Sequence, residues 1–571
     1  MKKRIKNKSA WRAALGYIGK YKLLLVLSLL LSACSVAATL YIPILVGGAI
    51  DDMLSMGAQG IVGGVAAAAV LAAAGGLVTW LAGIINNRIC YNVVRNARNE
   101  AFEHLQRVPL SYIDSRERGD IISRITSDAE QLGDGLLLGF TQLFTGVLTV
   151  AGTLGFMLAL EPVIAAAVAV LTPLSLLIAR FIARRTHSLF IGQSEARAAQ
   201  TAFVEEMLTN RKVVAAFSQQ EPACQRFGKL NEQVEKTSRT AAFFSSLVNP
   251  STRFVNAVVY AAVTLIGALA AIRGQMTVGT LSCLLSYANQ YAKPFNEISS
   301  VLTELQNALA CAERLFELQN APLQSADGPL ELNGPARVSM DNVCFSYVPS
   351  QPLIRDFSLE VPCGSRVAIV GPTGCGKTTL INLLMRFYDP QSGSISMNGI
   401  NATEISRASL RGNIGMVLQD TWLCSGTVRE NIALGRPNAT DEEIEAAARF
   451  SHAHEFIVKL PKGYDTVISD DDSISQGQKQ LLCISRVALA LPPMLILDEA
   501  TSSIDTRTEM KIQDAFARMM QGRTCFIVAH RLSTIRNADI ILVMKDGNIV
   551  EQGTHAELME RRGFYYQLNN A

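Results

Sequence analysis

This sequence is short of charged side chains. Asp, Glu, Lys and Arg make up 18% of its 571 residues, whereas a soluble domain has about 25%. A hydrophobic content of 49% excludes a disordered chain, because such chains are poor in apolar residues. A net charge of only +3 argues against a nucleic-acid partner, which needs a basic surface. Eleven cysteines, sparse and unclustered, argue against a secreted disulfide scaffold.

The missing charge is concentrated in the first half of the chain. Six runs of 28, 35, 26, 18, 19 and 19 residues contain no charged side chain, and they cover 23–50, 53–87, 135–160, 162–179, 254–272 and 274–292. A helix needs about 20 residues to cross the ~30 Å hydrocarbon core of a bilayer. We therefore predict six membrane spans at about 23–50, 60–85, 135–160, 162–183, 254–272 and 276–296.

The flanking charges give the spans one orientation. The segment up to Lys22 and the connections 86–134 and 180–253 are rich in Arg and Lys, and the other three links are short. Basic loops stay in the cytoplasm. The sequence thus predicts a multi-pass protein of the cytoplasmic membrane with both termini inside. A cleaved signal peptide is the alternative for the first run, but that run is too long and five more follow it.

The composition changes after about residue 320. Residues 321–336 hold three prolines and two glycines, which is typical of a linker. The part before residue 337 has a net charge of +6 (29 basic minus 23 acidic), and the remainder has −3 (23 minus 26). Strand-like apolar runs alternate with helical segments in the remainder, which indicates an α/β fold with a largely parallel sheet. We predict an all-α membrane domain at 1–320, a linker at 321–336 and an α/β domain at 337–571.

A glycine-rich motif follows one of these strand-like runs. Residues 371–378 read Gly-Pro-Thr-Gly-Cys-Gly-Lys-Thr between an apolar strand and an apolar helix, which is the phosphate-loop pattern in its usual setting. Glycines let backbone N–H groups turn toward phosphates, and the helix N-terminus adds positive potential. Lys377 would then reach the β- and γ-phosphates, and the Thr378 hydroxyl would hold Mg²⁺.

A second apolar run, Met494–Leu497, ends in two adjacent carboxylates. A buried strand rarely ends in two adjacent carboxylates unless a cation lies nearby. Asp498 suits the metal, and Glu499 suits the general base that polarises an attacking water. The alternative is a solvated strand end. His530 follows another apolar strand, and a single histidine is weak information by itself.

These motifs, together with several others, resemble those of ATP-binding cassette (ABC) transporters. The matches, in family order, are an adenine-stacking aromatic at Tyr347, a Q-loop at Gln419, a signature at 475–478 with Gln476 in place of a glycine, a D-loop at 502–505 and a switch histidine at His530. Six spans ahead of the cassette resemble the type IV exporter arrangement. Residues 114–128 and 205–227 resemble the two coupling-helix regions of that family.

The resemblance implies a role for each matching residue. Glu499 and His530 would be catalytic, and Thr378, Gln419 and Asp498 would hold Mg²⁺. ATP would contact Tyr347, Gly371, Pro372, Thr373, Gly374, Cys375, Gly376, Lys377, Thr378, Thr379, Gln419 and Asp498 of one chain, with Ser475, Gly477, Gln478 and Asp505 of a partner chain.

The family pattern also implies that two chains work together. The stretch Ser469–Ser473 is acidic where many homodimeric exporters have a Gly-Glu-Arg-Gly-like sequence. This variant resembles the intact-site subunit of heterodimeric multidrug exporters, so we expect a second half-transporter as partner, with a homodimer as the alternative.

The sequence leaves several substrates open. The leading expectation is ATP-driven export of amphipathic compounds from the lipid membrane by alternating access. The alternatives are a flippase for lipids or lipid-linked precursors, siderophore-type uptake by an exporter-shaped protein, and a non-transporting ATPase. The six spans argue against the last of these.

Overall fold

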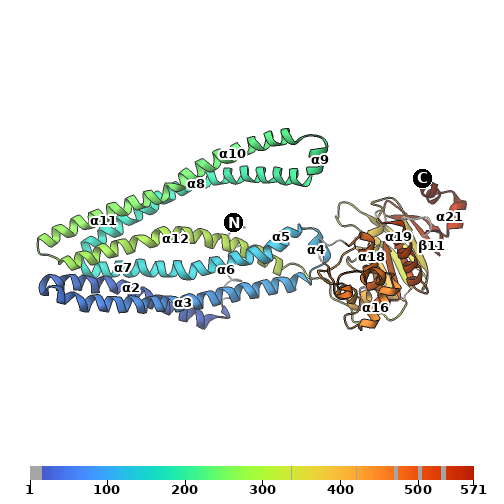
Figure 1. Ribbon diagram of the computed structural model, residues 1–571, viewed down its shortest axis with the longest axis horizontal. Coiled ribbons are helices and arrows are strands. Elements are labelled where there is room, and N and C mark those ends of the chain that lie inside the picture. The colour runs from blue at the N-terminus through green and yellow to red at the C-terminus, as the bar shows by residue number, and fades with distance from the viewer. Residues whose placement is uncertain are drawn as a thin grey trace. The chain divides into compact units, whose positions relative to one another are not determined.

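The computed structural model describes residues 16–17, 19–335, 337–418, 421–468, 474–498, 504–528 and 535–570. The chain divides into two compact units (Figure 1). The first comprises Met1–Gln106 with Glu117–Ala321, and the second comprises Arg107–Arg116 with Pro322–Ala571. The short segment Arg107–Arg116 thus groups with the C-terminal unit, although both of its flanks belong to the helical one.

The described elements of the first unit are all helices. They are α2 (Lys22–Met56), α3 (Ala58–Leu105), α5 (Arg118–Ser123), η1 (Arg124–Asp128), α6 (Ala129–Leu138), η2 (Gly139–Leu143), α7 (Phe144–Leu160), α8 (Pro162–Thr209), α9 (Arg211–Ala216), α10 (Gln220–Ser246), α11 (Val248–Ile272) and α12 (Val278–Gln319). Elements α5 to α7 follow one another without a break. In Figure 1 the pair α8 and α10 diverges from α3, α6 and α12 toward the end that carries α9.

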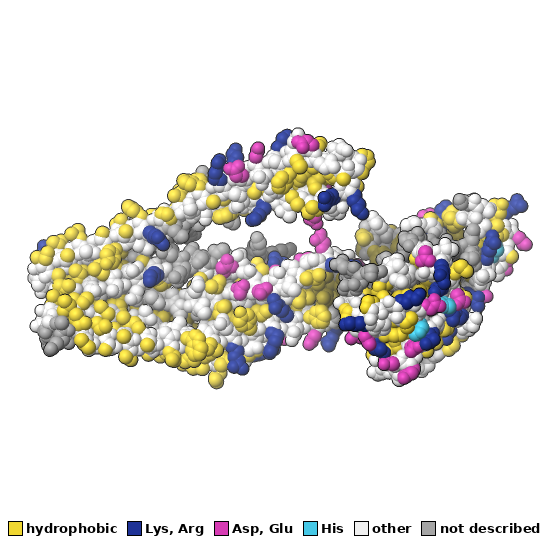
Figure 2. Space-filling model, in the orientation of Figure 1, with side chains coloured by type: hydrophobic (Ala, Val, Ile, Leu, Met, Phe, Trp, Pro, Cys, Tyr) yellow, Lys and Arg dark blue, Asp and Glu magenta, His cyan; other side chains and the backbone are white. Residues whose placement is uncertain are grey.

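Four described helical segments are long and apolar enough to cross a membrane: Lys22–Ser55, Ile61–Leu105, Arg118–Leu160 and Gln220–Ile272. A shorter apolar stretch, Pro162–Thr172, begins α8. Large apolar side chains on these helices point outward, including Leu23 and Ile272 at 84% exposure. Such exposure is costly in water and favourable in lipid. Figure 2 shows hydrophobic side chains gathered over the ends of α2 and α11 that lie away from α9. The first unit is therefore a membrane domain.

Small residues allow two of the membrane helices, α2 and α12, to approach closely. A Cβ on Gly279 would lie 2.1 Å from the carbonyl oxygen of Gly47, so a side chain there would force the helices apart. One turn farther, the Asp51 carboxylate accepts hydrogen bonds from the Gly279 amide (2.8 Å) and the Thr277 hydroxyl (2.6 Å). The Tyr287 hydroxyl donates to the carbonyl of Leu40 at 2.6 Å. These contacts satisfy polar groups that lipid cannot.

The second unit contains a six-stranded sheet with the order β12-β11-β3-β10-β9-β6. All neighbouring pairs are parallel except the edge pair β11 and β12. A four-stranded antiparallel sheet with the order β2-β1-β4-β5 and a pair β7-β8 accompany it. The strands are β1 (Val338–Phe345), β2 (Ile354–Val361), β3 (Arg366–Val370), β4 (Ser392–Met397), β5 (Ile400–Asn401), β6 (Ile414–Val417), β7 (Gly426–Thr427), β8 (Val467–Ile468), β9 (Met494–Asp498), β10 (Thr524–Val528), β11 (Ile540–Lys545) and β12 (Asn548–Gly553).

The second unit also contains helices. They are α4 (Leu110–Asp114), α13 (Lys377–Leu384), α14 (Arg407–Gly412), α15 (Val428–Ala433), α16 (Asp441–Phe450), α17 (His454–Ile457), η3 (Gly463–Asp465), α18 (Gln476–Ala490), α19 (Thr506–Met519), α21 (His555–Arg561) and α22 (Phe564–Asn570). Every residue of β9 and β10 is buried, as expected for parallel strands covered on both faces. The helical membrane domain followed by an α/β domain confirms the predicted fold class. The antiparallel sheet was not predicted.

Candidate nucleotide site

The parallel sheet brings the predicted motifs to one edge. Val528 at the end of β10 lies opposite Ile369 of β3 on one side and opposite Asp498 of β9 on the other. Val417 at the end of β6 lies opposite Leu497 of β9. The four strands therefore end nearly level, at the carboxyl edge where open α/β sheets bind their ligands. Gln419, Glu499 and His530 follow these strand ends within two residues, and they lie outside the described residues.

The phosphate loop after β3 depends on glycine at three positions with positive φ. These are Gly371 (156°), Gly374 (84°) and Gly376 (102°). A Cβ on Gly371 would lie 2.3 Å from the carbonyl oxygen of Met544, whereas one on Gly374 would meet no atom within 4 Å. The loop is thus packed against β11 on one side and open at Gly374 on the other. An open loop of this kind fits a phosphate chain.

Lys377 begins α13, directly after the loop. Its ammonium group donates to the carbonyl oxygens of Gly371 at 2.7 Å and Pro372 at 2.9 Å. The side chain is therefore folded back over the loop, where a bound phosphate would offer it stronger, charged acceptors. The next residue, Thr378, is exposed, and Thr379 is buried in the core beneath. The loop, the lysine and the first turn of α13 together fit the predicted phosphate site.

The predicted adenine-stacking residue, Tyr347, contacts the helix that follows the phosphate loop. The ring of Tyr347 packs edge-on against Phe345 at 5.0 Å and Tyr388 at 5.1 Å between centroids. Its hydroxyl accepts a hydrogen bond from Asn382 of α13 at 3.0 Å. The ring remains 47% exposed, which leaves area for a stacked base. Because α13 begins at the phosphate loop, this contact links the ring predicted to stack on the base to the predicted phosphate site.

The oxygen groups suited to Mg²⁺ are the exposed Thr378 hydroxyl and the buried Asp498 carboxylate at the end of β9. Mg²⁺ binds through one or two protein oxygens and completes its shell with phosphate and water. No group of three or more His, Cys, Asp or Glu side chains that could hold a metal alone occurs among the described residues. The chemistry of this pair therefore fits a metal that arrives with the nucleotide.

The signature and D-loop residues form a second group at two helix N-termini. Ser475 caps α18 in a reciprocal capping box with Gln478, and Asp505 caps α19 by accepting from the Thr508 amide at 2.9 Å. Hydrogen bonding to the backbone and the side chain of Thr508 lowers the pKa of Asp505. A Cβ on Gly477 would lie 2.6 Å from the Cγ2 atom of Thr508. The absence of a side chain at Gly477 thus lets α18 approach α19.

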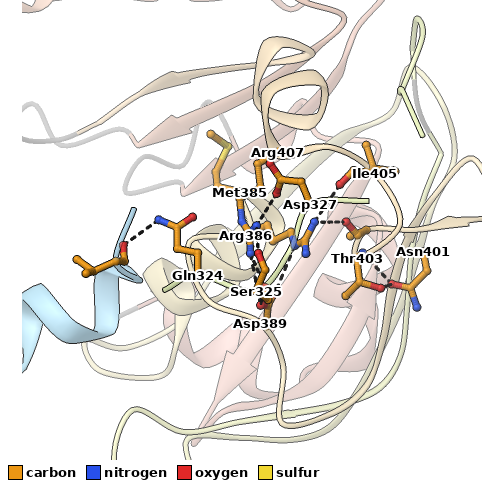
Figure 3. A network of polar contacts seen from close by, with 12 residues as sticks. Gln324, Ser325, Asp327, Met385, Arg386, Asp389, Asn401, Thr403, Ile405 and Arg407 are labelled. Atoms are coloured by element: carbon orange, nitrogen blue, oxygen red, sulfur yellow. Dashed lines mark hydrogen bonds and ion pairs between the residues drawn. The ribbon is translucent and has the colours of Figure 1, made fainter. Parts of the chain in front are cut away.

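A polar network that the sequence did not predict holds the linker. Figure 3 shows the guanidinium groups of Arg386 and Arg407 at its centre. Arg386 donates to the carbonyls of Ala402 and Ile405, each at 2.9 Å, and Arg407 donates to Ser325 and Asp327 of the linker. Arginines are rarely buried, so the sequence alone gave no reason to place these two inside.

The linker in turn holds the segment Arg107–Arg116 within the same unit. The Gln324 amide donates to the Arg107 carbonyl and its side chain donates to the Val108 carbonyl, each at 2.9 Å. The Tyr388 hydroxyl donates to the carboxylate of Asp114 at the end of α4. Burial and this carboxylate raise the pKa of Tyr388. The resemblance to a coupling-helix region at residues 114–128 pointed to this part of the chain, but nothing in the sequence singled out Tyr388.

We expect Arg386→Ala to destabilise the second unit by about 3–5 kcal/mol, because it leaves the buried carbonyls of Ala402 and Ile405 without their donor and removes one of the cations beside Asp389. For a unit of this size that corresponds to a fall of about 6–20 °C in its thermal midpoint. Differential scanning fluorimetry of the detergent-solubilised chain measures it. Arg337→Ala is the matched control, because the Arg337–Glu360 pair is exposed and such pairs contribute about 0–1 kcal/mol. Equal midpoints for the two variants would contradict the network.

Cys375 changes one expectation from the sequence. The position of Cys375 within the phosphate loop predicts that alkylation of its thiol inhibits ATP hydrolysis unless bound ATP protects it. In the structure this side chain is only 3% exposed. We therefore expect N-ethylmaleimide to modify the exposed Cys363 well before Cys375, and ATPase activity to survive that first modification. Mass spectrometry of timed samples checks the order. Rapid, ATP-sensitive labelling of Cys375 would show that the loop opens in solution.

Comparisons with known proteins agree with this architecture. The family model for the ABC transporter transmembrane region matches residues 25–295, and the model for ABC transporters matches residues 354–502. A fatty acid ABC transporter ATP-binding/permease protein of Mycobacterium bovis is 44% identical over 508 residues, which cover 89% of this chain and 80% of the relative.

Two further matches extend over most of the chain. A putative multidrug export ATP-binding/permease protein of Staphylococcus aureus is 36% identical, with 86% of this chain and 85% of the relative covered. The solved structure of a bacterial Atm1-family ABC exporter with ATP bound has a TM-score of 0.79 at 28% identity, with 96% of this chain and 98% of that chain covered.

Proposed function

This chain belongs to the ABC transporter family as an ATP-hydrolysing exporter that fuses a membrane domain to an ATP-binding domain, and we propose that it exports amphipathic compounds across the cytoplasmic membrane. The observation that carries the proposal is this fusion of apolar, membrane-length helices and a phosphate-loop domain in one chain. Both termini and the ATPase domain would lie in the cytoplasm, as the basic loops predict.

The roles proposed for the site residues follow their chemistry. The loop amides and Lys377 hold the phosphate chain, and Tyr347 stacks on the base. Glu499 accepts a proton from the attacking water, and His530 positions the terminal phosphate. Mg²⁺, held by Thr378, Asp498 and Gln419, would neutralise phosphate charge. Binding of ATP favours the closed arrangement of two ATPase domains, and hydrolysis removes that bias.

ABC exporters act as dimers, and we propose that this chain pairs with a second half-transporter. Ser475, Gly477, Gln478 and Asp505 would then complete the partner's nucleotide site. The acidic stretch Ser469–Ser473 favours a heterodimer; it lies outside the described residues. Co-purification from the native membrane tests this point. A single chain species with full ATPase activity would contradict the heterodimer.

The contact between α4 and the ATPase domain supplies a route for coupling. The Tyr388 ring touches the base-stacking Tyr347 at 5.1 Å and its hydroxyl bonds Asp114 of α4. A base stacked on Tyr347 would therefore be separated from α4 by one aromatic ring, that of Tyr388. Helix α4 belongs to the segment that leads to the membrane helices. We propose that movements of the ATPase domain reach the membrane through this contact.

A lipid substrate is the second candidate, and the relative from Mycobacterium bovis named as a fatty acid transporter favours it. Drug-like amphiphiles and lipids are separated by one experiment. ATPase activity of the chain in nanodiscs is measured with a hydrophobic cationic dye and with dodecanoate. Stimulation by the dye alone supports multidrug export, and stimulation by dodecanoate alone supports lipid transport. Stimulation by neither compound, together with no ATP-driven movement of either, would contradict the proposed function.

A further inference from the structure

Gln476 departs from the family signature, and the proposed function gives it no role. It is the first residue of α18 and stands where the resemblance expects a glycine. Its side-chain amide donates a hydrogen bond to the hydroxyl of Thr421 at 2.9 Å, across 55 residues of chain. Thr421 follows the Q-loop residue Gln419 by two positions. The variant residue thus joins the signature helix to the segment after the Q-loop.

The segment 421–424 is held against α18 beyond this hydrogen bond. The carbonyl oxygen of Trp422 accepts hydrogen bonds from Arg486 at 3.3 Å and from the thiol of Cys483 at 3.8 Å. The Arg486 guanidinium also lies 6.0 Å from the centre of the Trp422 ring, within reach of a cation–π interaction. Gln476, Cys483 and Arg486 are seven and three residues apart, which places them along one side of the helix. Three side chains of α18 therefore fix this segment.

The first turn of α18 also packs against the D-loop. A Cβ on Gly477 would lie 2.6 Å from Cγ2 of Thr508 and 3.0 Å from Cγ2 of Ile504. Ser475 and Gln478 bond each other in the capping box. The side chains of this turn are thus engaged within their own chain. Backbone N–H groups in the first turn of a helix lack partners within the helix and favour an anion, so they are the groups of the turn suited to a partner's phosphate.

Chain connectivity extends the hydrogen bond of Gln476 to the Q-loop. Consecutive Cα atoms are 3.8 Å apart, so two peptide units span at most about 7 Å. A large displacement of Gln419 must therefore displace Thr421, and with it the side chain of Gln476. In the proposed function Gln419 contacts Mg²⁺ in the chain's own nucleotide site, whereas the turn of Gln476 completes the partner's site.

We propose that Gln476 is a positioning residue, which fixes the signature turn through Thr421 so that the N–H groups of the turn meet the phosphate held by the partner chain. Its amide is engaged by Thr421 and does not touch the nucleotide. The inference rests on the proposed function, because it assigns a role within the turn that completes the partner's site. Without the hydrogen bond the turn is less well ordered before the two ATPase domains close. Closure then requires a higher ATP concentration, whereas hydrolysis after closure depends on Glu499 and keeps its rate.

The test measures ATP hydrolysis by the chain and its co-purified partner in nanodiscs over a range of ATP concentrations. Gln476→Leu and Thr421→Val each remove the hydrogen bond and keep the approximate size of the side chain. We expect each to raise the KM for ATP about two- to ten-fold, the effect of one net hydrogen bond, with kcat unchanged. The double variant should raise KM no further than either single variant, because both remove the same contact.

Two further variants serve as controls. Thr421→Ser retains the hydroxyl and should keep the native KM. Gln521→Leu removes an exposed glutamine of the same domain and should change neither KM nor kcat.

Three results would overturn the assignment. A native KM in Gln476→Leu would show that the hydrogen bond does not position the turn. A raised KM in Gln476→Leu beside a native KM in Thr421→Val would show that Gln476 contacts the nucleotide directly. A fall in kcat together with a lower thermal midpoint would show a structural role only. If Gln476→Leu hydrolyses ATP like the native protein while Glu499→Gln does not, the proposed function survives and only the role of Gln476 is wrong.

Discussion

Glu499→Gln is expected to bind ATP with native affinity and to lose about 10²- to 10⁴-fold in hydrolysis, which is the usual contribution of a general base. The glutamine keeps the size and hydrogen-bonding capacity of the side chain but cannot accept the proton of the attacking water. Two measurements separate the effects: fluorescent-ATP binding for affinity and phosphate release for turnover. Because ATP then persists at the site, the variant should also accumulate in its nucleotide-bound, closed dimer.

Glu560→Gln provides the matched control for that change. Glu560 lies on α21 of the same domain and is exposed, so both affinity and turnover should remain native. Native turnover in Glu499→Gln would remove the base from the proposed mechanism. A joint loss of binding and turnover would instead indicate that the substitution disrupts the end of β9.

Lys377→Ala is expected to weaken ATP binding by about 10²- to 10⁴-fold. The ammonium group would make charge-assisted hydrogen bonds to two phosphates, each worth about 1.5–3 kcal/mol, and each 1.4 kcal/mol corresponds to a factor of ten in affinity. The fold should survive, because the contacts of the ammonium group are with the loop itself: the carbonyls of Gly371 and Pro372 and the thiol of Cys375. Isothermal titration with a non-hydrolysable ATP analogue measures the affinity.

Lys459→Ala removes a lysine of the same domain that is exposed, and it should leave ATP affinity unchanged. Equal affinities in native protein and Lys377→Ala would contradict the assignment of residues 371–378 as the phosphate loop. A fall in affinity accompanied by a lower thermal midpoint would point to a structural role for the lysine.

The sequence predicted those features whose physical signal is local. Charge-free runs of membrane length predicted the helical domain, and apolar runs such as Met494–Leu497 predicted the parallel strands, because both face an apolar environment along their whole length. The phosphate loop was also local, since its glycines and Lys377 all lie within residues 371–377. All of these features have a pattern that can be recognised within about 20 residues.

The features that the sequence did not predict depend on contacts between distant residues. In the antiparallel strand β1 the adjacent residues Asp341 and Asn342 are both exposed, and the pairing with β2 has two irregularities. The strict alternation that identifies a half-buried strand is therefore broken. Arg386 and Arg407 read as surface residues until the linker folds onto them. The hydrogen bond between Gln476 and Thr421 joins residues 55 positions apart. Single-sequence periodicity cannot register such pairings.

We propose that ATP hydrolysis at this site drives amphiphiles out of the cytoplasm. The most direct measurement places the chain and its co-purified partner in inside-out vesicles and follows the ATP-dependent accumulation of a labelled amphiphile inside them. We predict accumulation in the native protein and none in Glu499→Gln, although both bind ATP. Accumulation that continues in Glu499→Gln, or amphiphile movement in the opposite direction, would contradict the account.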